Sequence, residues 1–133
     1  FLGIPQISLL TLATIAFLVF LGGIVSFMGY LFVASLGFFI EDAQAPGWIY
    51  SKFDMIFGGN ILPVVFLPLW LQTIAFYTPW FHSGYSAVLY MRHPNIAEFI
   101  GIFGMGIVWI IAFILLSLLS FRLARSRLLS NGG

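Results

Sequence analysis

Hydrophobic residues fill most of the chain, and the charged positions that interrupt them are clustered. The five basic and four acidic residues fall in three short clusters, at positions 41–54, 92–98 and 122–127. Three long runs carry no charge, at positions 1–40, 55–91 and 99–121. A charged side chain at the bilayer centre costs roughly 2.5–3.5 kcal/mol, so the runs can lie in lipid while the clusters lie near water. The pattern predicts an all-α integral membrane protein.

The first run predicts one long helix from Ile7 to Ile40. At 1.5 Å per residue it reaches about 50 Å, beyond a hydrocarbon core of about 30 Å. The alternative is a hairpin that turns at Gly22-Gly23, but such a turn leaves backbone groups unpaired in lipid and has no Asn, Asp or Pro. Small residues at helical spacing form a packing seam or the wall of a substrate path: Gly22, Ser26, Gly29, Val33 and Gly37.

A loop follows, in which Glu41 and Asp42 precede Pro46-Gly47. Two acids at a helix C-terminus oppose the macrodipole, so we expect solvent or a basic cytoplasmic partner to hold them. The second expected span runs from about Trp48 to Leu67, with Lys52 and Asp54 in its first turns at the water boundary. Its later part holds Gly58, Gly59, Asn60 and Pro63, where the helix is expected to kink or end.

The uncharged stretch from Pro63 to Met91 is broken into pieces too short to span a membrane. Its breaking residues are Pro63, Pro68, Pro79 and Gly84. Proline suits the start of a helix, so we expect short re-entrant or interfacial helices at 68–77 and 79–90. Its amphipathic rings are expected at headgroup level: Trp70, Tyr77, Trp80, His82, Tyr85 and Tyr90. Irregular backbone at membrane depth needs protein or a water-filled cavity beside it, so this stretch is the main functional candidate.

The last expected span runs from Ala97 to about Leu123, with Glu98 in its first turn. Three basic residues end it: Arg122, Arg125 and Arg127. By the positive-inside rule the C-terminus is cytoplasmic, which places the 41–52 loop in the cytoplasm and the 68–95 segment outside. The prediction is therefore about three long transmembrane helices plus two short outer helices, in one domain over residues 1–133. Because the chain starts at Phe1 in apolar sequence, we expect it to be part of a longer protein.

Composition excludes several classes of function. The chain is 62% hydrophobic and 7% charged, far from a soluble domain. A net charge of +1 offers no basic surface for nucleic acid, and the absence of cysteine excludes disulfides and thiolate chemistry. No phosphate-binding loop is present, and His82-Ser83 with His93 lacks the pattern of a hydrolase or a metal site. We assign no catalytic residue, cofactor or metal, and expect no enzymatic activity of its own.

One arrangement stands above this background, the order Gly58-Gly59-Asn60, Pro63, Pro68 with Trp70, and Pro79. It resembles the segment of ABC-2 type transporter permeases in which a glycine-containing span end is followed by three prolines and a tryptophan-leucine pair. Upstream, the Gly37–Asp42 stretch is similar to the aromatic and acidic helix end of the six-span subgroup. The resemblance covers about residues 10–127 and implies the C-terminal half of such a permease.

The resemblance implies a permease subunit of an exporter, which works with a cytoplasmic ABC ATPase subunit and a second permease half in a bacterial plasma membrane. The residues Gly58, Gly59, Asn60, Pro63, Pro68, Trp70 and Pro79 would then belong to the path or the outer re-entrant segment. Glu41 and Asp42 would be the cytoplasmic partner contact. The alternative is a structural or assembly subunit of a membrane complex that transports nothing, because packing seams and interfacial aromatics alone suffice for that role.

Overall fold

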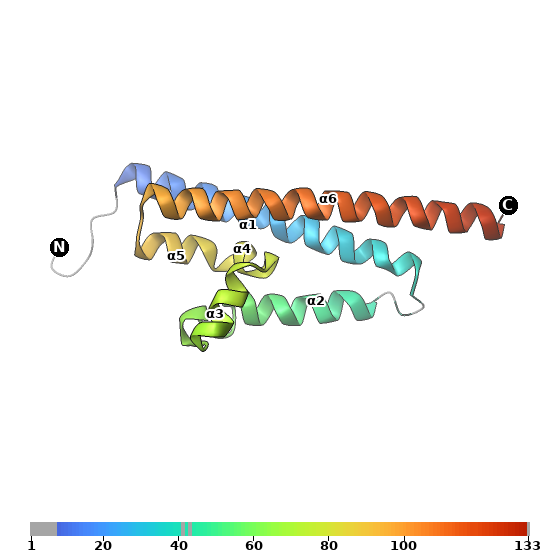
Figure 1. Cartoon of the computed structure of the whole chain (residues 1–133), viewed down its shortest axis with the longest axis horizontal. Coiled ribbons are helices and arrows are strands. Elements are labelled where there is room, and N and C mark those ends of the chain that lie inside the picture. The colour runs from blue at the N-terminus through green and yellow to red at the C-terminus, as the bar shows by residue number, and fades with distance from the viewer. Residues whose placement is uncertain (1–7, 41, 43, 133) are drawn as a thin grey trace.

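The computed structural model describes residues 8–40, 42 and 44–132, and the described parts form helices joined by turns. The order of elements is α1 (Leu9–Ser35), η1 (Leu36–Phe38), α2 (Gln44–Phe57), η2 (Val64–Phe66), α3 (Leu69–Phe76), α4 (Pro79–Gly84), α5 (Ser86–Arg92) and α6 (Ile96–Gly132). Figure 1 shows α1 and α6 side by side as the two longest elements, with α3 at the edge of the molecule away from α6.

The first apolar run is a single helix, as predicted, and not a hairpin. α1 continues through Gly22-Gly23 without a break. The Ser8 side chain caps its N-terminus by accepting a hydrogen bond from the Thr11 N–H at 3.1 Å. Since neither proline nor charge interrupts residues 9–35, nothing in the sequence stops the helix before its last turn tightens into η1.

The expected second span from Trp48 to Leu67 is wrong. α2 begins earlier, at Gln44, and ends at Phe57, so its 14 residues extend only about 21 Å. The Asp42 carboxylate accepts a hydrogen bond from the Gln44 N–H at 3.1 Å, which favours the earlier start. Gly59 has φ +77°, a left-handed conformation typical of a helix C-terminus, and the chain turns away there. Asp54 is consequently the eleventh residue of α2, and its expected place in the first turns is also wrong.

The proline-broken segment forms short helices close to the expected boundaries. Pro68 is the N-cap of α3, and Pro79 occupies the first turn of α4 behind the N-cap Thr78. The expected 79–90 helix is divided at Tyr85 into α4 and α5, although the Tyr85 N–H still bonds the Phe81 carbonyl at 2.9 Å. The last helix, α6, is longer than predicted, and Asn95 caps it by accepting from the Glu98 N–H at 2.8 Å.

The expected headgroup position is wrong for the aromatic rings that the structure buries. Trp70 and Tyr77 are exposed, at 65% and 58% of their surface. His82, Tyr85 and Tyr90 are instead buried in the packed core. Tyr90 is buried where α5 packs against α1, whereas Tyr85 packs with Val64 of η2 and Ala75 of α3, and composition reveals neither tertiary contact.

Buried contacts show that α6 runs parallel to α1. Near one end, Ile102 packs in a cluster with Leu18. At the other end, the Ser35 hydroxyl donates to Ser120 Oγ at 2.8 Å. The separation in sequence between the two members of a pair differs by only one residue between these pairs. The two helices therefore keep one register over their shared length.

The chain between these helices returns along α1 in the opposite direction, in pieces. Tyr50 of α2 packs against Gly29, a residue in the second half of α1. His82 of α4 lies against Gly22, the midpoint of α1, and Tyr90 of α5 joins the cluster of Leu18. The return is therefore made by α2, then α4 and α5, while η2 and α3 form a side excursion (Figure 1).

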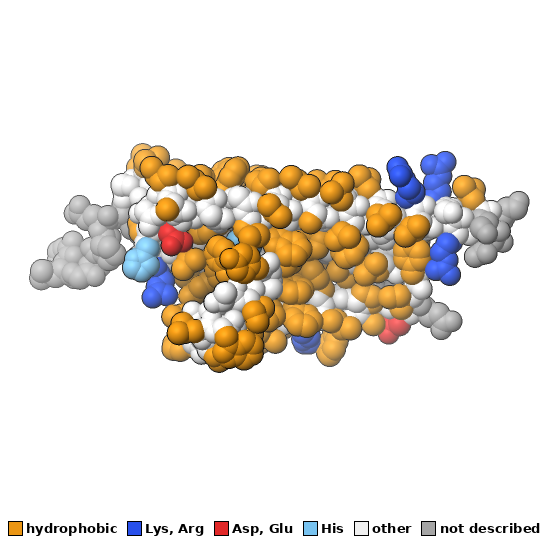
Figure 2. All heavy atoms as spheres, in the orientation of Figure 1, with side chains coloured by type: hydrophobic (Ala, Val, Ile, Leu, Met, Phe, Trp, Pro, Cys, Tyr) orange, Lys and Arg blue, Asp and Glu red, His pale blue; other side chains and the backbone are white. Residues whose placement is uncertain are grey.

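Within residues 8–40, 42 and 44–132, two helices are long and apolar enough to cross a membrane, at Leu9–Phe38 and Ile96–Arg127. The described part of the chain shows no third long span of the kind expected from the sequence, since the return path is built from short helices. Figure 2 shows hydrophobic side chains over most of the visible face, with most of the visible charged side chains toward its two ends. This distribution agrees with the expected position of the charge clusters near water, except for Asp54, which is hydrogen-bonded to Ser83 of α4 halfway along α1.

Candidate functional site

The centre of the broken return path is a direct contact between two backbone segments. A methyl group built on Gly84 would lie 2.5 Å from the Gly58 carbonyl oxygen, closer than real side chains approach. The same construction on Gly58 meets the Trp80 carbonyl oxygen at 3.2 Å. Glycine at these two positions therefore lets the end of α2 touch α4 without intervening side chains. We call this contact the glycine crossing.

A carboxylate lies beside the glycine crossing. Ser83 Oγ lies 2.7 Å from Asp54 Oδ1 and also 2.7 Å from the Trp80 carbonyl oxygen. A hydroxyl has one proton, so it can donate to only one of these acceptors at a time, and the ionised carboxylate is the stronger acceptor. The Asp54–Ser83 hydrogen bond joins α2 to α4 across 29 residues of sequence.

The position of Asp54 is electrostatically unfavourable by itself. Asp54 lies in the last turn of α2, where the helix macrodipole has its negative end. Its side chain is half-buried, and its own carbonyl accepts from the Gly58 N–H at 2.9 Å. Lys52 does not face it along the helix, and its ammonium lies 4.9 Å from the centroid of the Trp48 ring. Ser83 therefore supplies a donor at a place where negative charge is poorly tolerated.

Aromatic rings surround the crossing on the α2 side. The Trp80 ring stacks on Phe53 and Phe57, with centroids 4.9 and 5.9 Å away, and tilts against Tyr50 at 5.4 Å. Among the described residues, the buried Trp80 indole N–H has no hydrogen-bond partner. Such an orphan donor costs free energy, so this ring sits in an environment that is not optimised for stability alone.

His82 is the most buried polar ring of the segment, at 2% exposure. Its Nε2 lies 2.8 Å from the Phe76 carbonyl oxygen, so that nitrogen carries the proton and donates it. Within the described part of the chain, Nδ1 is buried without a partner. The histidine ties α4 to the end of α3 and is not the exposed interfacial tip that the sequence suggested.

An apolar groove opens beside the crossing, between α1, α2, α4 and α6. Its volume is about 530 Å³, within the range of small-molecule sites. Val33, Tyr50 and Trp80 line it and also line an adjoining groove of about 400 Å³. The seam residues Gly22 and Gly29 face α4 and Tyr50, which supports the packing interpretation of the seam at those two positions.

The structure brings some of the predicted site residues together and separates others. Gly58 and Gly59 lie at the crossing, and a methyl group on Gly59 would meet Tyr85. The exposed Asn60 side chain reaches back to the Asp54 carbonyl oxygen at 3.4 Å, and Pro79 is buried in α4. Pro63 caps η2, Pro68 caps α3, and Trp70 is exposed on α3, so these three shape the side excursion instead.

Of the predicted partner contacts, Glu41 lies outside the described residues. Asp42 is exposed and its carboxylate accepts from the Gln44 N–H, which gives it a capping role in this chain. Among the residues that the structure describes, no three His, Asp or Glu side chains are grouped to hold a metal ion.

The sequence did not predict that Asp54, Ser83 and Gly84 belong to one site. Asp42 could have indicated it, because a helix capped by Asp42 places Asp54 three turns after the helix start and not at the water boundary. No local pattern connects position 54 with position 83.

Comparison of the chain with protein-family models, curated proteins and solved structures returned no match. The resemblance to ABC-2 permeases therefore stays a prediction from the sequence.

Proposed function

We propose that this chain is part of a membrane permease and that the glycine crossing lies on or beside its substrate path. The observation that carries the proposal is a return path broken halfway along α1, with the Asp54 carboxylate at the break. An ionisable side chain at membrane depth is costly and usually functional. Broken helices that meet near the bilayer midplane are a recurring way to build a transport site.

The physical role of the crossing follows from its contacts. The two backbone segments touch through glycine, but the Trp80 ring of α4 stacks on Phe53 and Phe57 of α2, so sliding or tilting of α4 would have to move this ring as well. The Asp54–Ser83 hydrogen bond holds them in the observed arrangement. Movement of α4 against α2 would break this bond and leave the Ser83 proton to the Trp80 carbonyl, so the hydroxyl has an acceptor in both arrangements.

From the sequence resemblance, we propose that the chain is the C-terminal half of an ABC-2 type permease in a bacterial plasma membrane. Its C-terminus would lie in the cytoplasm, and the permease would export its substrate. A separate ATPase subunit would hydrolyse ATP, and a second permease half would complete the path. The apolar groove near Trp80 suits an uncharged or largely hydrophobic substrate.

The test begins with the full-length protein, purified from its native membrane in mild detergent. We expect an ATPase subunit to co-purify in stoichiometric amount. A stable complex that contains no ATPase would contradict the ABC proposal and favour the structural-subunit alternative.

A second measurement addresses the site itself in that purified complex. We expect Asp54→Asn to lower substrate-stimulated ATP hydrolysis by about tenfold or more, equivalent to about 1.4 kcal/mol of transition-state stabilisation. Glu98→Gln, which removes one carboxylate charge at the first turn of α6, is the matched control and should retain activity. Equal activity of Asp54→Asn and the unmodified protein would remove Asp54 from the path.

A further inference from the structure

A second pocket lies between the side excursion, formed by η2 and α3, and the last part of the return path, formed by α4 and α5. Its volume is about 220 Å³. The lining residues come from η2, α3, α4 and α5 and include Val64, Val65, Gln72, Tyr85, Leu89 and Arg92. We call it the excursion pocket. It shares no lining residue with the apolar groove beside Trp80.

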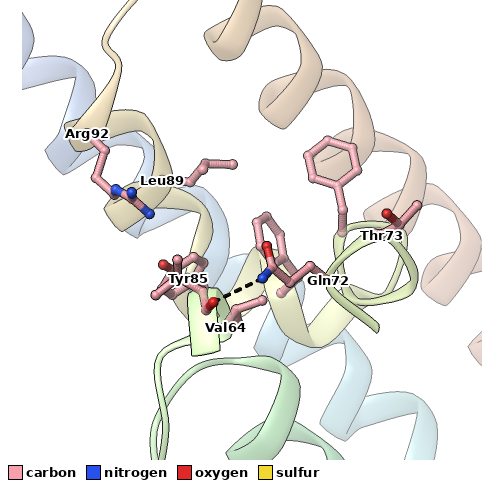
Figure 3. Close-up of a pocket in the computed structure, with 9 residues that line it drawn as sticks. Val64, Gln72, Thr73, Tyr85, Leu89 and Arg92 are labelled. Atoms are coloured by element: carbon pink, nitrogen blue, oxygen red, sulfur yellow. Dashed lines mark hydrogen bonds between the residues drawn. The ribbon is translucent and has the colours of Figure 1, made fainter. Parts of the chain in front are cut away.

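Most residues that line the excursion pocket are apolar, and the Gln72 side chain holds two of its elements together. Gln72 donates from Nε2 to the Val65 carbonyl at 3.0 Å and to the Leu67 carbonyl at 2.7 Å. These bonds fasten η2 to α3, as Figure 3 shows for the Gln72 amide in the pocket. Both bonds are donated by Nε2, so this nitrogen has no further proton to donate to a ligand.

Arg92 is the one charged side chain that lines the excursion pocket. It is the last residue of α5 and is exposed. Figure 3 shows its guanidinium directed from α5 toward the space beside Tyr85 and Leu89. A planar cation with five N–H donors is suited to bind a phosphate or carboxylate oxygen pair.

The residues that line the excursion pocket extend from the end of the molecule toward its middle. Arg92 lies in the charge cluster near the start of α6, at the end of the molecule where water is expected. Phe81 lies in α4, which packs against the midpoint of α1. A ligand with its head at Arg92 and its tail toward Phe81 would thus run from the membrane surface toward the middle, as an acyl chain does.

We propose that the excursion pocket binds a membrane lipid with an anionic headgroup, its phosphate on Arg92 and part of one acyl chain against Val65 and Leu89. This site is independent of the transport proposal, because it requires only that the chain lies in a membrane. Both lipids carry a phosphate that can accept hydrogen bonds from Arg92, but the guanidinium repels the choline cation of the zwitterionic lipid, so net headgroup charge favours the anionic lipid with the same tails.

The test uses native mass spectrometry of the full-length protein in mild detergent. The probes are dioleoyl phosphatidylglycerol and dioleoyl phosphatidylcholine, which share their tails and differ in headgroup charge. We expect the first bound phosphatidylglycerol to bind about tenfold more tightly than phosphatidylcholine, and Arg92→Gln to abolish this preference. Arg125→Gln, an exposed arginine on α6, is the matched control and should keep the preference.

Further variants and probes make the result decisive. Val65→Phe, which fills the pocket without changing charge, should weaken binding of both lipids. Inorganic phosphate at millimolar concentration should not displace the bound lipid, because it lacks the acyl chain. Retention of the preference in Arg92→Gln, its loss in Arg125→Gln alone, or full displacement by phosphate would each overturn the proposal.

Discussion

At the scale of single residues, the absence of a side chain determines where helices meet. Gly22 and Gly23 are neighbours on α1 with opposite surroundings. A methyl group on Gly22 would lie 2.6 Å from the His82 carbonyl oxygen, whereas one on Gly23 would meet nothing within 4 Å. Substitutions at these two positions therefore distinguish the effect of close packing from the general effect of glycine in a helix.

We expect Gly22→Ala to lower the free energy of unfolding by about 1–3 kcal/mol, because α4 must move away from α1 to admit the methyl group. Gly23→Ala should be neutral or stabilise the helix by up to about 1 kcal/mol. Thermal denaturation of the full-length protein in detergent measures both. Equal midpoints for the two variants would show that α4 does not lie against Gly22.

The Asp54–Ser83 hydrogen bond predicts coupling between two residues that are distant in sequence. Ser83→Ala removes the donor, and Asp54→Asn removes the charged acceptor. Because Asp54 is half-buried, we expect a coupling free energy of about 1 kcal/mol, below the range for fully buried charged hydrogen bonds. A double-mutant cycle on thermal stability measures it. Because asparagine keeps an acceptor oxygen, additive effects of the two substitutions would mean that the carboxylate charge adds nothing to this bond in the folded state.

At the scale of helices, the two long unbroken helices were predictable, whereas the contacts among the short helices were not. The run before position 40 predicted α1 as one helix, and the run after Ala97 predicted α6 from its first turn, because both depend on uninterrupted hydrophobic sequence. The end of α2 was predicted at Gly58, Gly59 and Asn60, and the left-handed turn at Gly59 confirms it, whereas the start of α2 at Gln44 was not predicted. The contact of Asp54 with Ser83 depends on how α4 packs, and no spacing rule spans 29 residues.

The parallel register of α1 and α6 gives a prediction for paired cysteines. Ser35 and Ser120 have their hydroxyl oxygens 2.8 Å apart, close to the geometry that a disulfide requires. In the cysteine-free 133-residue sequence, Ser35→Cys with Ser120→Cys should form a disulfide under mild oxidation, seen by mass spectrometry. Ser26→Cys with Ser120→Cys is the control and should remain reduced, since Ser26 lies nine residues, or about 13 Å, along α1 from Ser35. Linkage in the control alone would show a different register.

At the scale of the whole molecule, the arrangement of the elements determines which positions share a side of the membrane. α1 and α6 run in the same direction, and the broken return connects the end of one with the start of the other (Figure 1). Gln44, at the start of α2, and Ser126, near the end of α6, therefore lie toward one end, with His93 toward the other. All three side chains are exposed, so each can be replaced by cysteine without disturbing the core.

We expect a membrane-impermeant maleimide applied to intact cells to label His93→Cys, and to label Gln44→Cys and Ser126→Cys only after the membrane is opened. The shared side of positions 44 and 126 follows from the fold, whereas the choice of side follows from the three arginines near the C-terminus. Labelling of 44 and 126 from outside, with 93 protected, would reverse the orientation and keep the fold. Labelling of 44 and 126 from opposite sides would contradict the broken return itself, because α2, α4 and α5 would then not complete one crossing between α1 and α6.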